Sequence, residues 1–125
     1  MQGEIIESSR VRKCLWDGPF GMTSQNLAIA GAFQVPGGGP NQSPPYMIML
    51  NPGVTTQNVT MYSPLPSTVM WCHEIWNTAT ATGVLTIKGA SAGNPTIGSV
   101  AAGKRAEVVW NLYASPQEWA AFLSA

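Results

Sequence analysis

The single histidine, His73, must take part in any Ser/His/Asp or Cys/His catalytic device that this chain could form. The string His73-Glu74-Ile75-Trp76-Asn77 begins like a zinc-protease motif, but Asn77 stands where that motif requires a second histidine. The motif also needs two ligands on one face of a helix, whereas this segment has the pattern of a strand, which sends His73 and Glu74 to opposite faces. The sequence therefore predicts a structural histidine and no metal site.

Paired carboxylates for acid–base chemistry would have to come from only six acidic residues. Glu74 is notable because it lies inside an otherwise apolar strand. We expect it to form a salt bridge with Lys88, Lys104 or Arg105, or a polar contact between subunits. The glycines of segment 37–39 are not followed by the Lys-Ser/Thr of a phosphate loop, so they predict a linker. The chain thus offers no coherent catalytic constellation, and we predict a non-enzyme without a cofactor.

The charge balance excludes several classes of partner. Six basic and six acidic residues cancel, and charged residues make up 10% of the sequence, against about 25% in an average domain. No net field draws the chain to nucleic acid or anionic lipid. We expect no secretory signal, because the N-terminus lacks a basic start followed by an apolar stretch, and we find no apolar run that could span a membrane. Cys14 and Cys72 form no metal-binding spacing and are predicted to be buried thiols.

The N-terminal segment differs in composition from the rest of the chain. Half of all charges lie in the first seventeen residues, namely Glu4, Glu7, Arg10, Arg12, Lys13 and Asp17. Bulky apolar groups are interleaved with them: Val11, Leu15, Trp16 and Phe20. The segment 36–45 is rich in proline and glycine and predicts a linker or long surface loop. We therefore divide the chain into an arm and linker over residues 1–45 and a β domain over 46–125, and we expect the arm to dock on a partner by strand addition or in a groove.

Strand patterns recur every ten to fifteen residues after the linker. The predicted strands are Tyr46–Leu50, Gln57–Tyr62, Val69–Asn77, Val84–Lys88, Ile97–Val100 and Ala106–Leu112. Gly103-Lys104-Arg105 resembles a charged hairpin tip, and residues 117–122 fit either a helical turn or a last strand. No long window has a helical period. The sequence thus predicts an all-β fold, a small antiparallel β-sandwich or barrel with an extended N-terminal arm.

Four tryptophans and Glu74 are the candidate core or subunit-interface residues of this domain. The strand Val69–Asn77 carries bulky apolar groups on both faces, so it is either central between two layers or has an outer face that meets another subunit. Trp71, Trp76, Trp110 and Trp119 have the spacing of core residues, although tryptophan is also enriched at interfaces.

Several of these motifs resemble a known family. The matching strings are Asn58-Val59-Thr60-Met61-Tyr62, Ile75-Trp76-Asn77-Thr78, Gly83-Val84-Leu85-Thr86-Ile87, Ile97-Gly98, Gly103, Glu107-Val108-Val109-Trp110-Asn111 and a late Trp119. In this order they look like the small β domain of tailed-bacteriophage particle proteins, which include capsid decoration (cement) proteins, head fibres and tail fibres. The resemblance covers about residues 46–122 and favours a strand for residues 117–122.

The resemblance implies an oligomer, commonly a trimer, on the outer surface of a virion. We expect a structural decoration protein whose partners are the major capsid protein and further copies of itself, with no role in binding nucleic acid or membrane. Val11, Leu15, Trp16 and Phe20 would bury apolar area on the capsid. Arg12 and Lys13 would pair with acidic capsid groups. The alternative is a head-fibre or tail-fibre subunit with a host-receptor or carbohydrate-binding surface.

Overall fold

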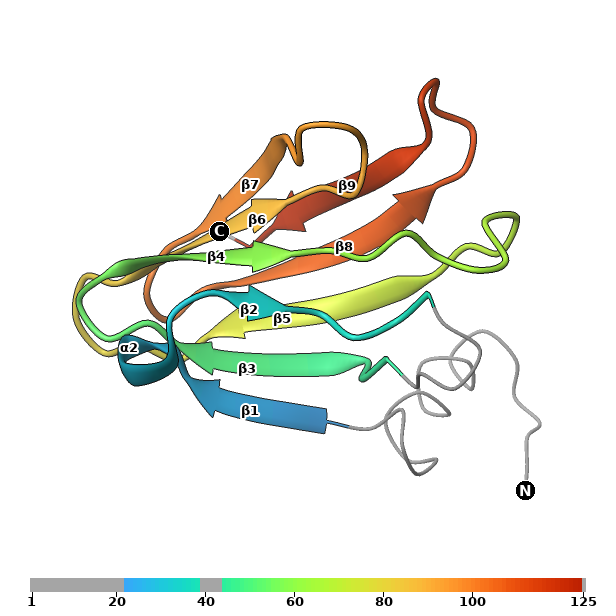
Figure 1. Ribbon diagram of the computed structural model, residues 1–125. Helices are drawn as coiled ribbons and strands as arrows, with labels where there is room; N and C mark the ends of the chain where they lie inside the picture. Colours follow the sequence, from blue (N-terminus) through green and yellow to red (C-terminus); the bar gives the residue numbers. More distant parts are fainter. Residues whose placement is uncertain (1–21, 39–43, 125) are drawn as a thin grey trace.

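The computed structural model describes residues 22–38 and 44–124 of the 125-residue chain. These residues form two β-sheets that face each other, with one short helix at their end (Figure 1). The six arm residues proposed as capsid contacts, and Cys14, lie outside the described residues.

One sheet has five strands in the order β1-β3-β5-β8-β9. Their bounds are β1 Met22–Asn26, β3 Met47–Asn51, β5 Cys72–Asn77, β8 Arg105–Asn111 and β9 Glu118–Leu123. The other sheet has four strands in the order β2-β4-β6-β7. Their bounds are β2 Phe33–Gln34, β4 Thr56–Thr60, β6 Val84–Lys88 and β7 Thr96–Val100. The helix α2, Leu27–Ala30, is capped by Asn26, whose side-chain oxygen accepts from the N–H of Ala28 at 3.0 Å.

Both sheets are mixed, which differs from the antiparallel arrangement that the sequence predicts. The pairs β1–β3, β3–β5, β2–β4 and β4–β6 are parallel, whereas β5–β8, β8–β9 and β6–β7 are antiparallel. From β1 to β6 the chain crosses to the opposite sheet after every strand. Between two neighbouring strands of one sheet, such as β1 and β3, the chain passes through one strand of the other sheet, which runs in the opposite direction. The two neighbours are therefore parallel. The described strands form two layers and not one closed barrel.

The predicted division at residue 45 does not follow the sheets. Strands β1 and β2 come from the segment that the sequence assigns to arm and linker, and they pair with β3 and β4. The predicted hairpin tip at residues 103–105 is also wrong, because β7 and β8, which flank it, belong to different sheets. Among the described strands, the hairpins are β6–β7 and β8–β9. The tail is a strand, as the resemblance implies.

The core lies between the sheets and follows the period of two that a half-buried strand requires. Its aliphatic side chains are Leu27, Val35, Ile48, Leu50, Val59, Ile75, Leu85, Ile87, Val100, Ala106 and Val108. Buried Asn77 joins the two layers, since its side-chain amide donates to the carbonyls of Gly83 and Val100 at 2.9 and 2.8 Å. Asn77 therefore supplies hydrogen bonds to two buried backbone carbonyls, one beside each of two neighbouring strands.

Candidate interaction surface

The five-stranded sheet turns one face away from the core, and here we call it the outer face. Its central row crosses all five strands, because Met22 is paired with Met47, Met47 with Glu74, Glu74 with Glu107, and Glu107 with Phe122. Neighbouring positions of the same face are Ser24, Met49, Cys72, Trp76, Arg105, Val109 and Ala120. Met22 and Phe122 are both 61% exposed. The outer face is thus mostly apolar and carries few charges.

Three side chains of this face satisfy one another's polar groups. The Nε1–H of Trp76 donates to Glu74 Oε1 at 2.9 Å, and the guanidinium of Arg105 forms an ion pair with Glu74 Oε2 at 2.9 Å. The same guanidinium lies 5.2 Å from the centroid of the Trp76 ring, within the range of a cation–π contact. The salt bridge that the sequence predicts for Glu74 is confirmed, with Arg105 as the partner.

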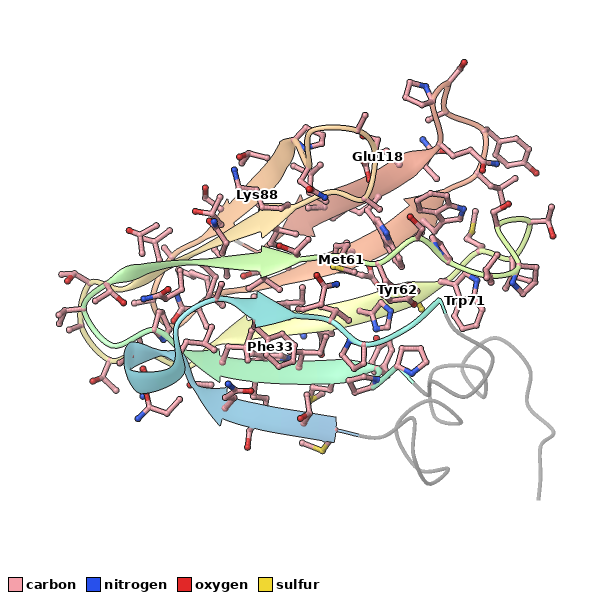
Figure 2. The ribbon with its side chains drawn as sticks, viewed as in Figure 1. Phe33, Met61, Tyr62, Trp71, Lys88 and Glu118 are labelled. Carbon is pink, nitrogen blue, oxygen red and sulfur yellow. The ribbon has the colours of Figure 1, made fainter. Side chains whose placement is uncertain are left out.

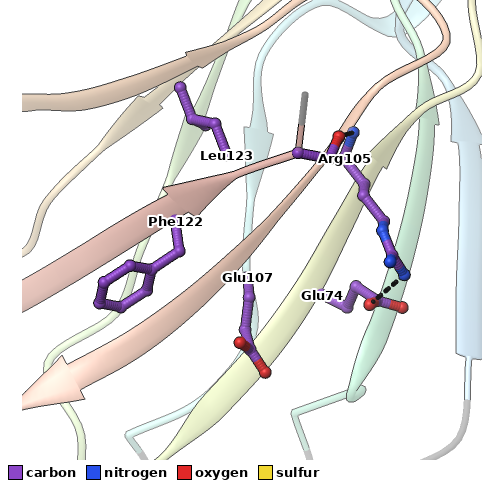
Figure 3. Close-up of a pocket in the computed structure, with 6 residues that line it drawn as sticks. Glu74, Arg105, Glu107, Phe122 and Leu123 are labelled. Atoms are coloured by element: carbon purple, nitrogen blue, oxygen red, sulfur yellow. Dashed lines mark hydrogen bonds and ion pairs between the residues drawn. The ribbon is translucent and has the colours of Figure 1, made fainter.

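Glu107 is left without a partner in the same row. Its carboxylate is exposed and has no hydrogen bond or ion pair to another described residue. It stands directly across from Glu74 on the next strand, and like charges in that position repel. Glu74, Arg105, Glu107, Phe122, Leu123 and Ser124 line a hollow of about 300 Å³ (Figure 3). Among these lining residues, Arg105 is the one cation, whereas Glu74 and Glu107 both carry a carboxylate. The hollow therefore has an excess of negative charge beside the Phe122 ring.

The tryptophans named from the sequence divide between core and surface. Trp110 and Trp119 are 5% and 2% exposed and belong to the core. Trp71 is partly exposed and packs against the core, whereas Trp76 is partly exposed on the outer face. Each of the four indole N–H groups has an acceptor, respectively Ser67 O, Tyr62 O, Pro66 O and Glu74 Oε1. Of these rings, only Trp76 is positioned to meet a partner across the outer face.

His73 has the structural role that the sequence predicts. It is 2% exposed and faces the core, while Glu74 lies on the outer face. Its Nδ1 lies 2.6 Å from the carbonyl oxygen of Pro45, and its Nε2 lies 2.7 Å from the hydroxyl of Tyr62. A carbonyl can only accept, so Nδ1 carries the proton and Nε2 accepts from the Tyr62 hydroxyl. Burial lowers the pKa of His73 to about 4, so the ring is neutral at neutral pH.

Burial also raises the pKa of Tyr62 above its ordinary value, and nearby Cys72 acts in the same direction. The Tyr62–His73 pair is therefore neutral at neutral pH, and its two rings lie beside those of Trp71 and Trp119. Figure 2 shows Tyr62 and Trp71 close together at the start of β5. Among the described residues, no group of three or more His, Cys, Asp or Glu side chains is placed to hold a metal ion. Cys72 is partly exposed, in contrast to the buried thiol that the sequence predicts.

Glu118 fastens the β6–β7 loop to the start of β9. Its carboxylate accepts from the N–H groups of Ala90 and Ser91 at 2.7 and 2.9 Å, from the Ser91 hydroxyl, and from the N–H of Trp119 at 2.9 Å. Burial opposes ionisation, but these hydrogen bonds outweigh it and hold the pKa of Glu118 below its ordinary value. Glu118 therefore acts as a charged clamp between the β6–β7 loop and the start of β9 (Figure 2).

We expect Glu118→Ala to loosen this loop. Hydrogen bonds to a charged group contribute about 1.5–3 kcal/mol each when lost, so amide exchange at Ala90 and Ser91 should accelerate by about tenfold or more. Hydrogen exchange followed by NMR measures this rate. The matched control is Gln117→Ala, which removes a neighbouring hydrogen bond to Leu112 O. Equal acceleration in both variants would show that Glu118 is not the clamp.

A second exposed apolar region lies at the end of the sheets where three loops meet. Leu65 is 65% and Tyr113 is 83% exposed, and Val69 and Met70 are exposed nearby in the chain. A groove of about 420 Å³ runs between these loops, and Ser67, Trp110 and Gln117 are among its lining residues. None of the described residues that line the groove has an ionisable side chain. This end of the molecule thus offers a neutral surface of mixed aromatic and hydroxyl character.

Comparisons with known proteins leave the surface to be interpreted on its own chemistry. No family model, no curated protein and no solved structure matches the chain. Within residues 22–38 and 44–124, no helix has the length and apolar character needed to cross a membrane.

Sequence reasoning named Glu74 and Trp76 as core or subunit-interface residues but did not single out Glu107 and Phe122. Alternation alone places both of them opposite the buried positions of β8 and β9. Their position in one row with Glu74 depends on the order of strands in the sheet, which the sequence does not reveal.

Proposed function

We propose that this chain is a structural virion protein, a decoration protein that binds the outer surface of a phage head and stabilises contacts between capsomers. The observation that carries the proposal is the outer face, on which exposed Met22 and Phe122 flank a row that contains the Glu74–Arg105 ion pair and Glu107, a carboxylate without a partner among the described residues. An exposed apolar face of this kind marks a surface that another polypeptide segment covers. The family resemblance of residues 46–122 supplies the setting, in which the partners are the major capsid protein and other copies of the chain, as a homotrimer.

The test is co-sedimentation with heads that were assembled without this protein. The full chain should pellet with the heads, and deletion of residues 1–20 should abolish binding because it removes the apolar and basic arm. Circular dichroism and thermal melting check that the truncated chain still folds, and analytical ultracentrifugation gives the oligomeric state of the full chain. A folded, truncated chain that still binds heads would contradict the assignment of recognition to the arm. Failure of the full chain to bind would contradict the decoration role.

The alternative function, a fibre subunit with a receptor- or carbohydrate-binding surface, is favoured by one observation. Tyr113 and Leu65 are strongly exposed at the end of the sheets, beside the neutral groove. Aromatic rings with a polar edge are suited to such binding. Tyr113→Ser should then abolish attachment to host cells and leave head binding unchanged. If Tyr113→Ser instead lost head binding and still attached to host cells, the result would contradict this alternative.

A further inference from the structure

The outer face is complementary to a segment that is apolar and carries positive charge. Glu107 has no partner among the described residues, while Arg105 is already engaged with Glu74. The hollow that Glu107 shares with Phe122 has room for a further side chain. A cationic side chain placed there would pair with Glu107 and contact the aromatic ring.

The chain itself contains a segment with this composition. Its cations are Arg10, Arg12, Lys13, Lys88, Lys104 and Arg105. Arg105 is paired with Glu74, and Lys88 donates to the hydroxyl of Thr96 at 2.8 Å, on the other sheet. Half of the cations thus fall within residues 10–13, next to the apolar Leu15, Trp16 and Phe20. The segment 10–20 matches the outer face in both charge and apolar character.

We propose that residues 10–20 bind the outer face of their own five-stranded sheet, with Arg12 or Lys13 paired to Glu107 and part of the segment's apolar side chains covering Trp76 and Phe122, which leaves the others to contact the capsid. The inference deepens the proposed function, because it names the platform that carries the capsid-contacting arm.

The point at which the described chain begins supports a contact within one molecule. Met22 starts β1 and heads the same row that contains Glu74 and Glu107. From β1 to β8 there are three strand spacings, which amount to about 14 Å. Lys13 precedes Met22 by nine residues (22 − 13 = 9), and a stretch of that length spans up to about 30 Å. The segment can therefore reach the hollow of its own sheet. A tethered segment binds at an effective concentration of about millimolar, well above that of a second copy in dilute solution.

Docking also prepares the arm for its partner. Only one cation is needed for Glu107, so the remaining basic residues of segment 10–13 stay available for acidic groups of the capsid. A recognition segment held on a rigid sheet loses less conformational freedom on binding, which improves affinity. This last step alone rests on the proposed function.

Zero-length cross-linking with a carbodiimide tests the contact on the full chain without capsids. In the background Lys88→Arg/Lys104→Arg, Lys13 is the only lysine. We expect an amide link between Lys13 and Glu107 or Glu74, found by peptide mass spectrometry in a product of single-chain mass. A parallel variant with Arg12→Lys allows for a shift of one residue. No link from either position to these carboxylates would overturn the proposal. A link found only in a product of twice the mass would also overturn it, and would assign the face to a second copy.

Matched variants separate a specific contact from a chance encounter. Phe122→Ser should lower the linked fraction about tenfold, as expected for a loss of roughly 1.4 kcal/mol of apolar contact. Leu65→Ser, which changes a similarly exposed side chain at the loop end, should leave the linked fraction unchanged. Equal yields in the two variants would overturn the role of the outer face. The cross-linking experiment contains no capsid, so failure to cross-link does not affect the head-binding result. A chain that cross-links but does not sediment with heads contradicts only the decoration role.

Discussion

Replacement of Trp119 by alanine is expected to destabilise the fold by about 3–5 kcal/mol, the usual loss for a large aromatic residue in a core. Trp119 is 2% exposed, and its ring centroid lies 5.1, 5.5 and 5.5 Å from those of Tyr62, His73 and Trp110. Its Nε1–H also donates to the carbonyl of Tyr62 at 2.8 Å. The variant therefore loses apolar burial, ring contacts and the bond that fixes the β4–β5 loop to β9.

Since whole domains are stable by only about 5–15 kcal/mol, this loss is a large part of the total. Thermal melting should show a drop of more than about 10 °C in Tm. The control is Tyr113→Ala, which removes an aromatic ring that is 83% exposed and should change Tm by only a few degrees. If Trp119→Ala melts within a few degrees of the control, the contacts of Trp119 with Tyr62, His73 and Trp110 contribute little to the stability of the fold.

Strand positions were predictable from the sequence because alternation is a local property. Val84–Lys88 matches β6 at both ends, and most other predicted strands differ from the observed ones by no more than two residues at either end. The strand Val69–Asn77 is the exception, since its first three residues belong to a loop that Trp71 and Trp110 fasten through their indole N–H groups. Burial of His73 and the pairing of Glu74 could also be predicted, because they depend on the face that each side chain takes.

Strand direction and partner choice could not be predicted, because they depend on how the chain moves between layers. Nothing in the composition of β1, Met22–Asn26, marks it as a strand, since it is polar and exposed. It is held by five register positions on β3, a neighbour that lies 25 residues further on in the chain (47 − 22 = 25). The row that joins Glu74 to Glu107 and Phe122 follows only once the sheet order is known. The candidate surface thus required the structure.

The stability of the protein is expected to fall as the pH is lowered from about 7 to 5, and His73 is the cause. Burial lowers the pKa of His73 in the fold to about 4, against an ordinary value of 6.5 in the unfolded chain. Between pH 7 and 5, His73 binds a proton in the unfolded chain but stays neutral in the folded chain, so acid favours unfolding. The stabilisation is fully present above pH 6.5 and is lost as the pH falls towards 4. Linkage gives a loss of about 2 kcal/mol by pH 5 and about 3 kcal/mol in total.

Glu118 does not account for this range. Its pKa in the fold lies below the ordinary value of 4.5, so its stabilising contribution is lost only at lower pH. Urea denaturation at pH 7, 6 and 5 measures the slope, and His73→Gln should flatten it. Because His73 is the only histidine, its ring gives a single set of NMR signals, which should keep the neutral chemical shift in the folded protein at pH 5. A signal that titrates near pH 6.5 would show that the imidazole is open to solvent, which contradicts its place between Tyr62, Trp119 and the carbonyl of Pro45.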